Sequence, residues 1–300
     1  MDYGEYYWKI TCTDIDDNQA YSPEYFVTIN SGNVFDGQVY WKNLNWNKLL
    51  HVAKLNKMEY ALALSLVKII SRHSIKIPTI ILLELNKILD KGRYNRLKLL
   101  NTLKFLNFLS EKFDIEYIVI KQFIPIPYIT YDVDILIREQ DFKKWCIILR
   151  HLGFINLSER LRLKKIKKLQ YRRFEAVFYK KGYLPIELYT DFSWAGIPSL
   201  PTTFCWKKKV FTNFDNLKIP VLDVEADLLV LLNHTIFKEG VIKLLDFLYI
   251  IELLRRRNFE IKYLLSAADV YRWAHVASLI CLLYTSPSPR DLSTSRMPSS

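Results

Sequence analysis

The chain has 300 residues, 50% of them hydrophobic and 25% charged, which is the composition of a globular protein long enough to bury one or two cores. Lysine and arginine outnumber the acids by 43 to 31, and the net charge of +12 attracts phosphates and nucleic acids or simply solubilises the surface. With only eight glycines, a mechanism that needs a glycine-rich phosphate loop is disfavoured.

Cysteine usage and the length of apolar runs bear on compartment and membranes. The four cysteines lie far apart and form no CxxC pair, so neither a zinc site nor a disulfide framework is expected, and a reducing compartment fits. The N-terminus lacks the basic region and apolar core of a signal peptide. No apolar run approaches the ~20 residues that span a bilayer. A cytoplasmic protein that does not bind membranes is therefore expected.

Residues 1–44 form an aromatic and polar segment that carries no functional pattern. Within it, Tyr25–Ile29 has the composition of a strand. Asn30–Asn33 follows with the composition of a turn.

Residues 45–113 are the first region with a regular periodicity. Apolar residues recur there at helical spacing, which predicts a helical region. Pro78 is expected to open one helix that continues through Ile88. Gly92 is expected to end it, and a further amphipathic helix is expected to run through Leu109.

Residues 114–222 differ from the region before them, because short apolar runs replace the helical spacing. A strand, a loop, a second strand, a helix and a hairpin predict the α+β class, built on a small mixed sheet. Helical spacing returns in residues 223–283, in about three segments. The predicted elements of the central region are the strands Ile115–Ile120 and Tyr131–Ile137, the helix Asp141–Leu152 ended by Gly153, and the strands Phe174–Tyr179 and Pro185–Tyr189 joined as a hairpin at Lys180–Gly182.

The last segment, Tyr284–Ser300, breaks the helical pattern abruptly and contains no stretch able to form a core. Its composition is typical of a disordered terminus. It also resembles a translated read-through of sequencing-adapter DNA, which is the interpretation we favour. The natural chain is then expected to continue differently after about Leu282, and the tail carries no functional conclusion.

The sequence YDVDILI contains two candidate metal ligands. Asp132 and Asp134 are two residues apart on an expected strand, so both carboxylates project from the same face. Two acids on one face of an apolar strand repel each other and lose hydration, a cost that a bound Mg²⁺ or Mn²⁺ would offset. An edge strand whose polar face meets water is the competing interpretation.

A third acid, Glu187, interrupts the apolar strand PIELY in the same way. If that strand lies beside the strand of Asp132 and Asp134, three carboxylates converge. Such a cluster suits a two-metal site for in-line attack on a phosphoryl group. Asp191 lies four residues after Glu187 and is a reserve ligand if the strand continues that far; the other interpretation is a loop acid at the strand end.

The stretch from Ile115 to about Leu254 resembles the nucleotidyltransferase superfamily that includes polymerase β, and most of all an uncharacterised prokaryotic branch of it. The resemblance rests on IEYIVIK, PY-x3-DVDILI, a helix ending in LGF, IELY and EADLLVLLNH. It implies a nucleotidyltransferase-type sheet flanked by helical regions. It also implies that Asp132, Asp134 and Glu187 are the catalytic residues and the ligands of Mg²⁺ or Mn²⁺.

The chain departs from this superfamily at the point where a Gly-Ser pair usually holds the triphosphate through backbone amides. Lys121, Gln122 and Phe123 occupy that region, and no glycine occurs between Gly92 and Gly153. Lys121 and Gln122 are therefore the candidate nucleotide-binding residues, Lys121 through its charge. The alternative is that triphosphate binding is weakened or lost.

Three further features carry weaker signals. The segment Arg160–Arg173 places eight basic residues around an apolar side and is expected to be a helix on the sheet, either as a solvated basic face or as a nucleic-acid surface near the site. His234 follows a run of leucines, which is typical of a core or interface group, with catalysis as the lesser alternative. Asp246, in an apolar helix, is expected to make a structural hydrogen bond, with His234 as a candidate partner.

The preferred hypothesis is a Mg²⁺-dependent enzyme that transfers a nucleoside monophosphate from an NTP to an unknown acceptor, which is a small molecule, a protein or RNA. The alternative is a catalytically degenerate nucleotidyltransferase fold that binds a nucleic acid or a protein, for instance as an antitoxin. The three acids favour the enzyme, whereas the missing Gly-Ser pair favours the binding module. A weaker alternative is a basic helical RNA-binding protein whose acids are incidental.

Overall fold

The structure is a computed structural model that describes residues 6–10, 25–29, 44–73, 77–124, 126–157, 175–194, 197–239 and 241–254, together with residues 266 and 269. Near the N-terminus, β1 (Tyr6–Ile10) and β2 (Tyr25–Ile29) pair antiparallel, which confirms the second of these strands. The following predicted segments lie outside the described residues: the turn Asn30–Asn33, the basic segment Arg160–Arg173, most of residues 255–283 and the tail Tyr284–Ser300.

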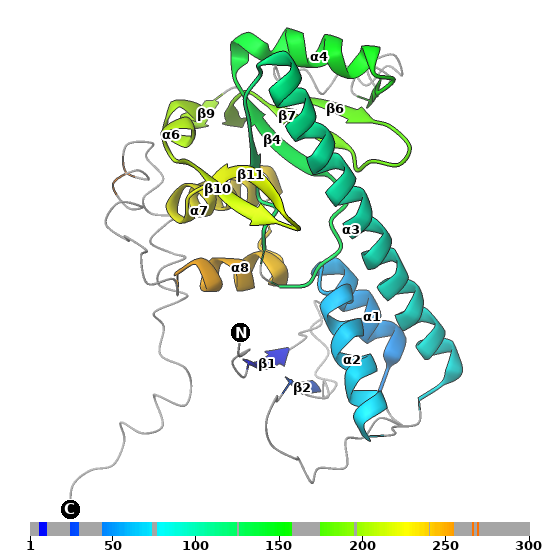
Figure 1. Cartoon of the computed structure of the whole chain (residues 1–300). Coiled ribbons are helices and arrows are strands. Elements are labelled where there is room, and N and C mark those ends of the chain that lie inside the picture. The colour runs from blue at the N-terminus through cyan, green and yellow to red at the C-terminus, as the bar shows by residue number, and fades with distance from the viewer. Residues whose placement is uncertain are drawn as a thin grey trace, which may run out of the picture.

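Three helices form a helical unit at one end of the described chain (Figure 1): α1 (Trp46–Leu55), α2 (Glu59–His73) and α3 (Thr79–Phe113). Apolar side chains spaced by three and four residues face one another and form its small core, in which Ala63 and Leu85 are fully buried. Asn45 caps α1 by accepting a hydrogen bond from the Lys48 amide at 3.0 Å. The helical periodicity of residues 45–113 therefore corresponds to real helices.

Gly92 does not end a helix, and the prediction that it would was wrong. It lies inside α3, a single helix of 35 residues that extends over about 50 Å. A glycine costs a helix only about 1 kcal/mol, which the rest of so long a helix can offset. The residue is small because α2 packs there: a Cβ on Gly92 would lie 2.2 Å from Cε2 of Tyr60. Gly92 thus marks the position at which α3 lies in close contact with α2.

A seven-stranded mixed sheet lies at the centre of the molecule, in the order β10-β11-β3-β4-β7-β6-β5. β11 and β3 are parallel, as are β4 and β7, and the other neighbours are antiparallel. With helices before, between and after its strands, the chain has the predicted α+β class. The strands are β3 (Tyr117–Ile120), β4 (Val133–Ile137), β5 (Ile155–Asn156), β6 (Glu175–Tyr179), β7 (Ile186–Tyr189), β10 (Lys209–Phe214) and β11 (Leu217–Leu222).

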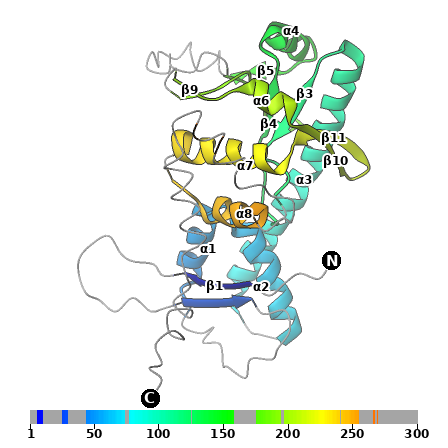
Figure 2. The ribbon, with the colours of Figure 1, turned by 90° about the vertical axis from the view of Figure 1, so that its left-hand side faces the viewer.

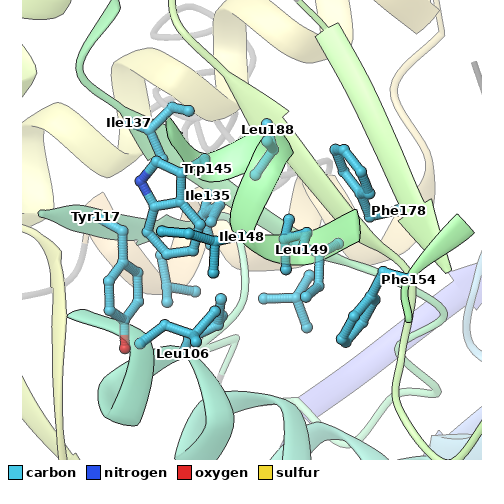
Figure 3. Packing of buried hydrophobic residues seen from close by; sticks show 14 of the residues in the cluster. Leu106, Tyr117, Ile135, Ile137, Trp145, Ile148, Leu149, Phe154, Phe178 and Leu188 are labelled. Carbon is cyan, nitrogen blue, oxygen red and sulfur yellow. The ribbon is translucent and has the colours of Figure 1, made fainter. Parts of the chain in front are cut away.

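Both faces of the sheet are covered, because side chains alternate between two apolar clusters. One face packs against α3 and α4 (Phe142–His151), where Trp145 and Phe178 are fully buried (Figure 3). The opposite face packs against α6 (Thr202–Lys207) and the helices after residue 223. Alternate residues of the central strands β3 and β4 belong to one or the other of these two clusters. A three-layer arrangement results, with the sheet between two layers of helices.

The end of α4 is determined by local sequence, as predicted. Gly153 follows the helix with a φ of +83°, a conformation that glycine adopts without steric cost. The Phe154 amide donates to the Leu149 carbonyl at 2.9 Å, so the last turn closes as a Schellman motif. The chain then turns back into β5.

Two hairpins flank the centre of the sheet, and only one of them was predicted. The predicted pairing of β6 with β7 is confirmed. The hairpin of β10 and β11 was missed, although Asp215 and Asn216 form its two-residue turn with φ values of +45° and +65°. An Asp-Asn pair between two alternating segments is a recognisable signal for such a turn.

The C-terminal part of the described chain is helical: α7 (Val224–Asn233), the π-helical turn η4 (His234–Glu239) and α8 (Leu244–Leu254). α8 lies between α7 and the helical unit in both views (Figures 1 and 2). Among the described residues, no helix has the length and apolar character needed to cross a membrane. The smaller elements are η2 (Glu139–Asp141), β8 (Phe192–Trp194) and β9 (Ile197–Leu200).

Candidate active site

The three predicted acids lie together at the middle of the sheet, and we call Asp132, Asp134 and Glu187 the carboxylate cluster. Asp134 and Glu187 are direct neighbours in the parallel pairing of β4 with β7, so their side chains leave the same face. Asp132 lies immediately before β4, which begins two residues later than predicted. Because β4 is the fourth of seven strands, the edge-strand interpretation of the acids is wrong.

The carboxylate cluster faces η4, which supplies the nitrogen-bearing side chains of His234 and Lys238. Lys121, at the end of β3, places its Nζ 2.8 Å from Oδ2 of Asp134. The same Nζ lies 3.3 Å from Nδ1 of His234 and 5.0 Å from the centre of the Tyr189 ring. Asp134 is buried, with 8% of its surface exposed, and the Lys121 side chain is 9% exposed. This is therefore a nearly dry ion pair.

A second lysine serves Glu187. The Tyr189 hydroxyl donates to Oε2 of Glu187 at 2.8 Å and accepts from Nζ of Lys238 at 2.6 Å. Lys238 also lies 3.7 Å from Oε2 of Glu187 directly. The ammonium group is thus linked to the carboxylate by both its charge and the shared tyrosine.

The charges within the site shift the pKa values of the three acids in opposite directions. Burial and the charge of Asp134 raise the pKa of Asp132 and the pKa of Glu187 above their usual values. Burial alone would also raise the pKa of Asp134, but the charge and hydrogen bond of Lys121 hold that pKa below its usual value. Asp134 is consequently the firmly ionised member of the cluster.

His234 is neutral at physiological pH. Burial, followed by the positive charges of Lys121 and Lys238, lowers the pKa of His234 to about 3. Its Nδ1 can then accept from Lys121, while Nε2 lies 3.5 Å from Oε1 of Glu239. His234 therefore belongs to the surroundings of the site, beyond the core role expected from its sequence context.

The backbone of Lys121 is held in an unusual conformation. Its φ of +59° lies in the left-handed region, which glycine adopts more readily than lysine. This is the region of the sequence where the superfamily resemblance leads one to expect glycine. The Lys121 amide donates at 3.3 Å to Oδ1 of Asp227 in α7, and the Tyr249 hydroxyl of α8 donates to Oδ2 of the same residue. Two helices thus secure the turn that carries the lysine.

Gln122 uses its side chain within the protein. Its Nε2 donates to the Asp132 carbonyl at 2.8 Å, and its Oε1 accepts from Oγ1 of Thr130 at 3.1 Å. The Tyr128 hydroxyl donates to the Gln122 carbonyl at 2.7 Å. These bonds close the loop between β3 and β4 and position Asp132. Nucleotide binding by Lys121 and Gln122 stays a prediction.

The weaker sequence candidates have other partners. β7 ends at Tyr189, so the strand does not continue to Asp191, whose Oδ1 accepts from Oγ of Ser193 at 3.0 Å. Asp246 accepts from the Lys243 amide at 3.4 Å at the start of α8. It therefore makes a structural hydrogen bond, but not with His234.

Several residues of the site have no distinctive local sequence pattern. Lys238 is a single lysine in a turn, and Tyr189 is one tyrosine in an apolar strand. Asp227 did carry a signal, because it is an acid within the apolar helix EADLLVLLN, as Asp246 is in its own helix. That pattern marks an acid with a specific buried partner. It would have pointed to Asp227 as a structural element of the site.

The donor chemistry of the carboxylate cluster fits a hard divalent cation. Mg²⁺ and Mn²⁺ take carboxylate oxygens, and the raised pKa values of Asp132 and Glu187 show negative charge that a cation would stabilise. In this arrangement, no group of three or more His, Cys, Asp or Glu side chains among the described residues is placed so that it could hold a metal ion. Coordination by the whole cluster therefore requires its side chains to turn towards a common point.

Comparisons with known proteins show the family of the chain. A family model described as an uncharacterised nucleotidyltransferase matches residues 42–287. Among solved structures, the crystal structure of the lincosamide antibiotic adenylyltransferase LnuA with lincomycin bound is similar at a TM-score of 0.36 and 16% sequence identity, over 52% of this chain and 96% of that chain. No curated protein shows significant sequence similarity to the chain.

Proposed function

The chain belongs to the uncharacterised nucleotidyltransferase family, and on that premise we propose that it transfers a nucleoside monophosphate from an NTP to an acceptor at the carboxylate cluster. The observation that carries the proposal is the pairing of Asp134 with Glu187 on adjacent central strands, with Asp132 beside them. A binding module has no evident need for three acids that repel one another in a half-buried place. The acceptor is a small molecule, a protein or RNA.

The carboxylate cluster would hold Mg²⁺ or Mn²⁺, which when bound neutralises charge on the phosphoryl oxygens and aligns attacking and leaving groups. Glu187 is the candidate base. Its carboxylate can accept the proton that the acceptor hydroxyl loses as its oxygen bonds to the α-phosphorus. The bond from that phosphorus to the bridging oxygen breaks in the same step, and pyrophosphate leaves.

The nitrogen-bearing side chains around the carboxylate cluster suit the other substrate. Lys121 and Lys238 face the cluster from β3 and η4, and each adds one positive charge. A triphosphate carries several negative charges, so it is attracted to the same place once the carboxylates are neutralised. His234 adds no charge, because its pKa is lowered to about 3.

One observation favours a second candidate, a non-catalytic fold that binds a nucleic acid or a protein. The ion pair between Lys121 and Asp134 already stabilises the most acidic carboxylate without a metal. In a degenerate enzyme, a lysine in this position would replace the metal permanently. This candidate predicts that the protein binds neither NTPs nor Mg²⁺ at the cluster.

Titration calorimetry with each of the four NTPs, with and without Mg²⁺, separates the two candidates. The wild type is expected to bind an NTP in the presence of Mg²⁺, and the variant Asp132→Asn/Asp134→Asn to bind it about 100-fold or more weakly, because both ligands are lost. Asp191→Asn is the matched control, since that acid follows Glu187 by four residues in the sequence but accepts a hydrogen bond from Ser193. Absence of NTP binding by the folded wild type would refute the enzyme and support the binding module.

A further inference from the structure

We infer that the Lys121 ammonium occupies one of the two cation positions of the carboxylate cluster, so that the site takes a single divalent ion. The inference rests on the proposed function, because it concerns the same cluster. It replaces the two-ion site that three carboxylates alone would suggest. The divalent ion then depends most on Asp132.

The first argument is the contact itself. Nζ of Lys121 lies 2.8 Å from Oδ2 of Asp134, and both side chains are close to fully buried. A charge pair removed from water is held far more strongly than one at the surface. The pair uses one oxygen of Asp134, and a carboxylate has a second oxygen able to accept.

The second argument is that the surroundings fix Lys121 in this place. His234 offers Nδ1 to the ammonium at 3.3 Å, and the Tyr189 ring faces it at 5.0 Å. Its backbone has a φ of +59°, and Asp227 holds the amide. A residue kept in a disfavoured conformation by several partners is over-determined, which is common at functional sites. A lysine that lay near the acids only by chance would not be held by so many contacts.

The third argument comes from how the carboxylates are partnered. Asp134 has Lys121, and Glu187 has Lys238 at 3.7 Å and the Tyr189 hydroxyl at 2.8 Å. Within the described part of the chain, no ion pair involves Asp132. It is therefore the carboxylate that still lacks a cationic partner at close range. One divalent ion satisfies that need, whereas a second ion would lie beside the Lys121 ammonium and be repelled by it.

The test is a count of Mn²⁺ ions bound per chain, measured by electron paramagnetic resonance on the whole protein. The Asp132→Asn/Asp134→Asn variant gives the background, which is subtracted. Wild type is expected to bind one Mn²⁺ above that background. Lys121→Met, which keeps the bulk, and Lys121→Gly, which suits the positive φ, are expected to bind two. Lys87→Met, at a side chain that is 72% exposed, is the control for the loss of one positive charge and is expected to bind one.

Two ions bound to wild type, no ion bound to wild type, or a count of one in both folded Lys121 variants would each overturn the inference. Circular dichroism shows which of the two Lys121 variants are folded. If neither is folded, the number of ions bound to wild type alone tests the inference. The result is separable from the proposed function. Two ions in a wild type that binds NTPs would refute the inference alone, whereas one ion with no NTP binding would refute the function alone.

Discussion

Two lysines near the carboxylate cluster have backbone conformations that glycine or asparagine adopts more readily. Lys121 has a φ of +59°, and Lys57, in the turn between α1 and α2, has a φ of +57°. Lys57 sits just after α1, where the Met58 amide donates to the Ala53 carbonyl at 2.7 Å in a Schellman motif that usually has glycine at this position. In both places, a lysine therefore stands at a backbone position where glycine is the residue with the lower conformational cost.

At the residue scale, His234 gives a pH-dependent prediction. Its pKa is lowered to about 3 in the folded protein by burial and by Lys121 and Lys238, against the contrary effect of Asp134 and Glu239. An unfolded chain takes up the proton near pH 6.5, so stability falls as the pH drops below that value, by at most ~1.4 kcal/mol per pH unit. Between pH 7 and pH 5, we therefore expect the His234→Gln variant to lose about 2 kcal/mol less stability than the wild type.

Urea denaturation of wild type and His234→Gln at pH 5, 6 and 7 measures this effect. The native wild type should lose stability faster than the variant as the pH falls. Parallel losses in the two proteins would mean that the pKa of His234 is not lowered in the folded state. In that case the arrangement of charges around Lys121 would need another explanation.

The residues of the site divide into those that the sequence can place and those that it cannot. Asp134 and Glu187 could be placed, because each interrupts an apolar strand and the alternation of side chains decides its face. The start of β4 was predicted two residues too early, at Tyr131. The segment around Asp132 is held by hydrogen bonds from Gln122, which are non-local and which a local pattern does not encode. The contact of Lys121 with Asp134 depends on how β3 meets β4, which no local pattern encodes.

At the scale of elements, α3 connects the two parts of the described chain. Its first half belongs to the core of the helical unit and its second half to the core under the sheet. Asn95 Nδ2 donates to the Thr130 carbonyl at 2.7 Å, and Oγ1 of Thr102 accepts from the Leu184 amide at 3.0 Å. The helix is therefore bonded to the loops that lead into β4 and β7. Periodicity predicted its helical character, but its continuity followed from packing against α2.

Gly92 and Tyr60 give a prediction whose sign depends on context. In wild type, Gly92→Ala places a Cβ 2.2 Å from Tyr60, and we expect it to lower the free energy of unfolding by about 1–3 kcal/mol. In a Tyr60→Ala background the obstruction is gone. There the same change should raise the free energy of unfolding by about 0.5–1 kcal/mol, because alanine is the better helix former.

A double-mutant cycle by urea denaturation measures both effects. The single variants, the double variant and wild type are compared at one pH. If Gly92→Ala were stabilising in wild type as well, the ring of Tyr60 could not lie against α3 as described. The glycine would then be a residue without a packing role.

At the scale of the whole molecule, the helical unit reaches the carboxylate cluster through the turn between α1 and α2. The Leu244 amide donates to Oδ1 of Asn56 at 3.1 Å, and the Leu245 amide to the Asn56 carbonyl at 3.3 Å, so the turn is attached to the start of α8. On its other side, the Tyr131 hydroxyl donates to Oε1 of Glu59 at 3.3 Å. Lys57 lies between these two anchors, next to the residues that precede Asp132. Its positive charge is one of those that lower the pKa of Asp132, against the larger effects of burial and Asp134.

Lys57 is therefore expected to take part in substrate attraction from outside the sheet. Lys57→Met should weaken NTP binding by about 1 kcal/mol, or about five-fold, at low ionic strength, because one charge near the phosphates is lost. Raising the salt to about 0.5 M should shrink the difference, since Lys57 is exposed and its charge is screened. Calorimetry at both salt concentrations measures this, with Lys54→Met as the control at another exposed lysine of the same unit. An equal effect of both changes would mean that Lys57 acts only as one of many surface charges. A larger effect of Lys57→Met than of Lys54→Met would make the helical unit part of the substrate site.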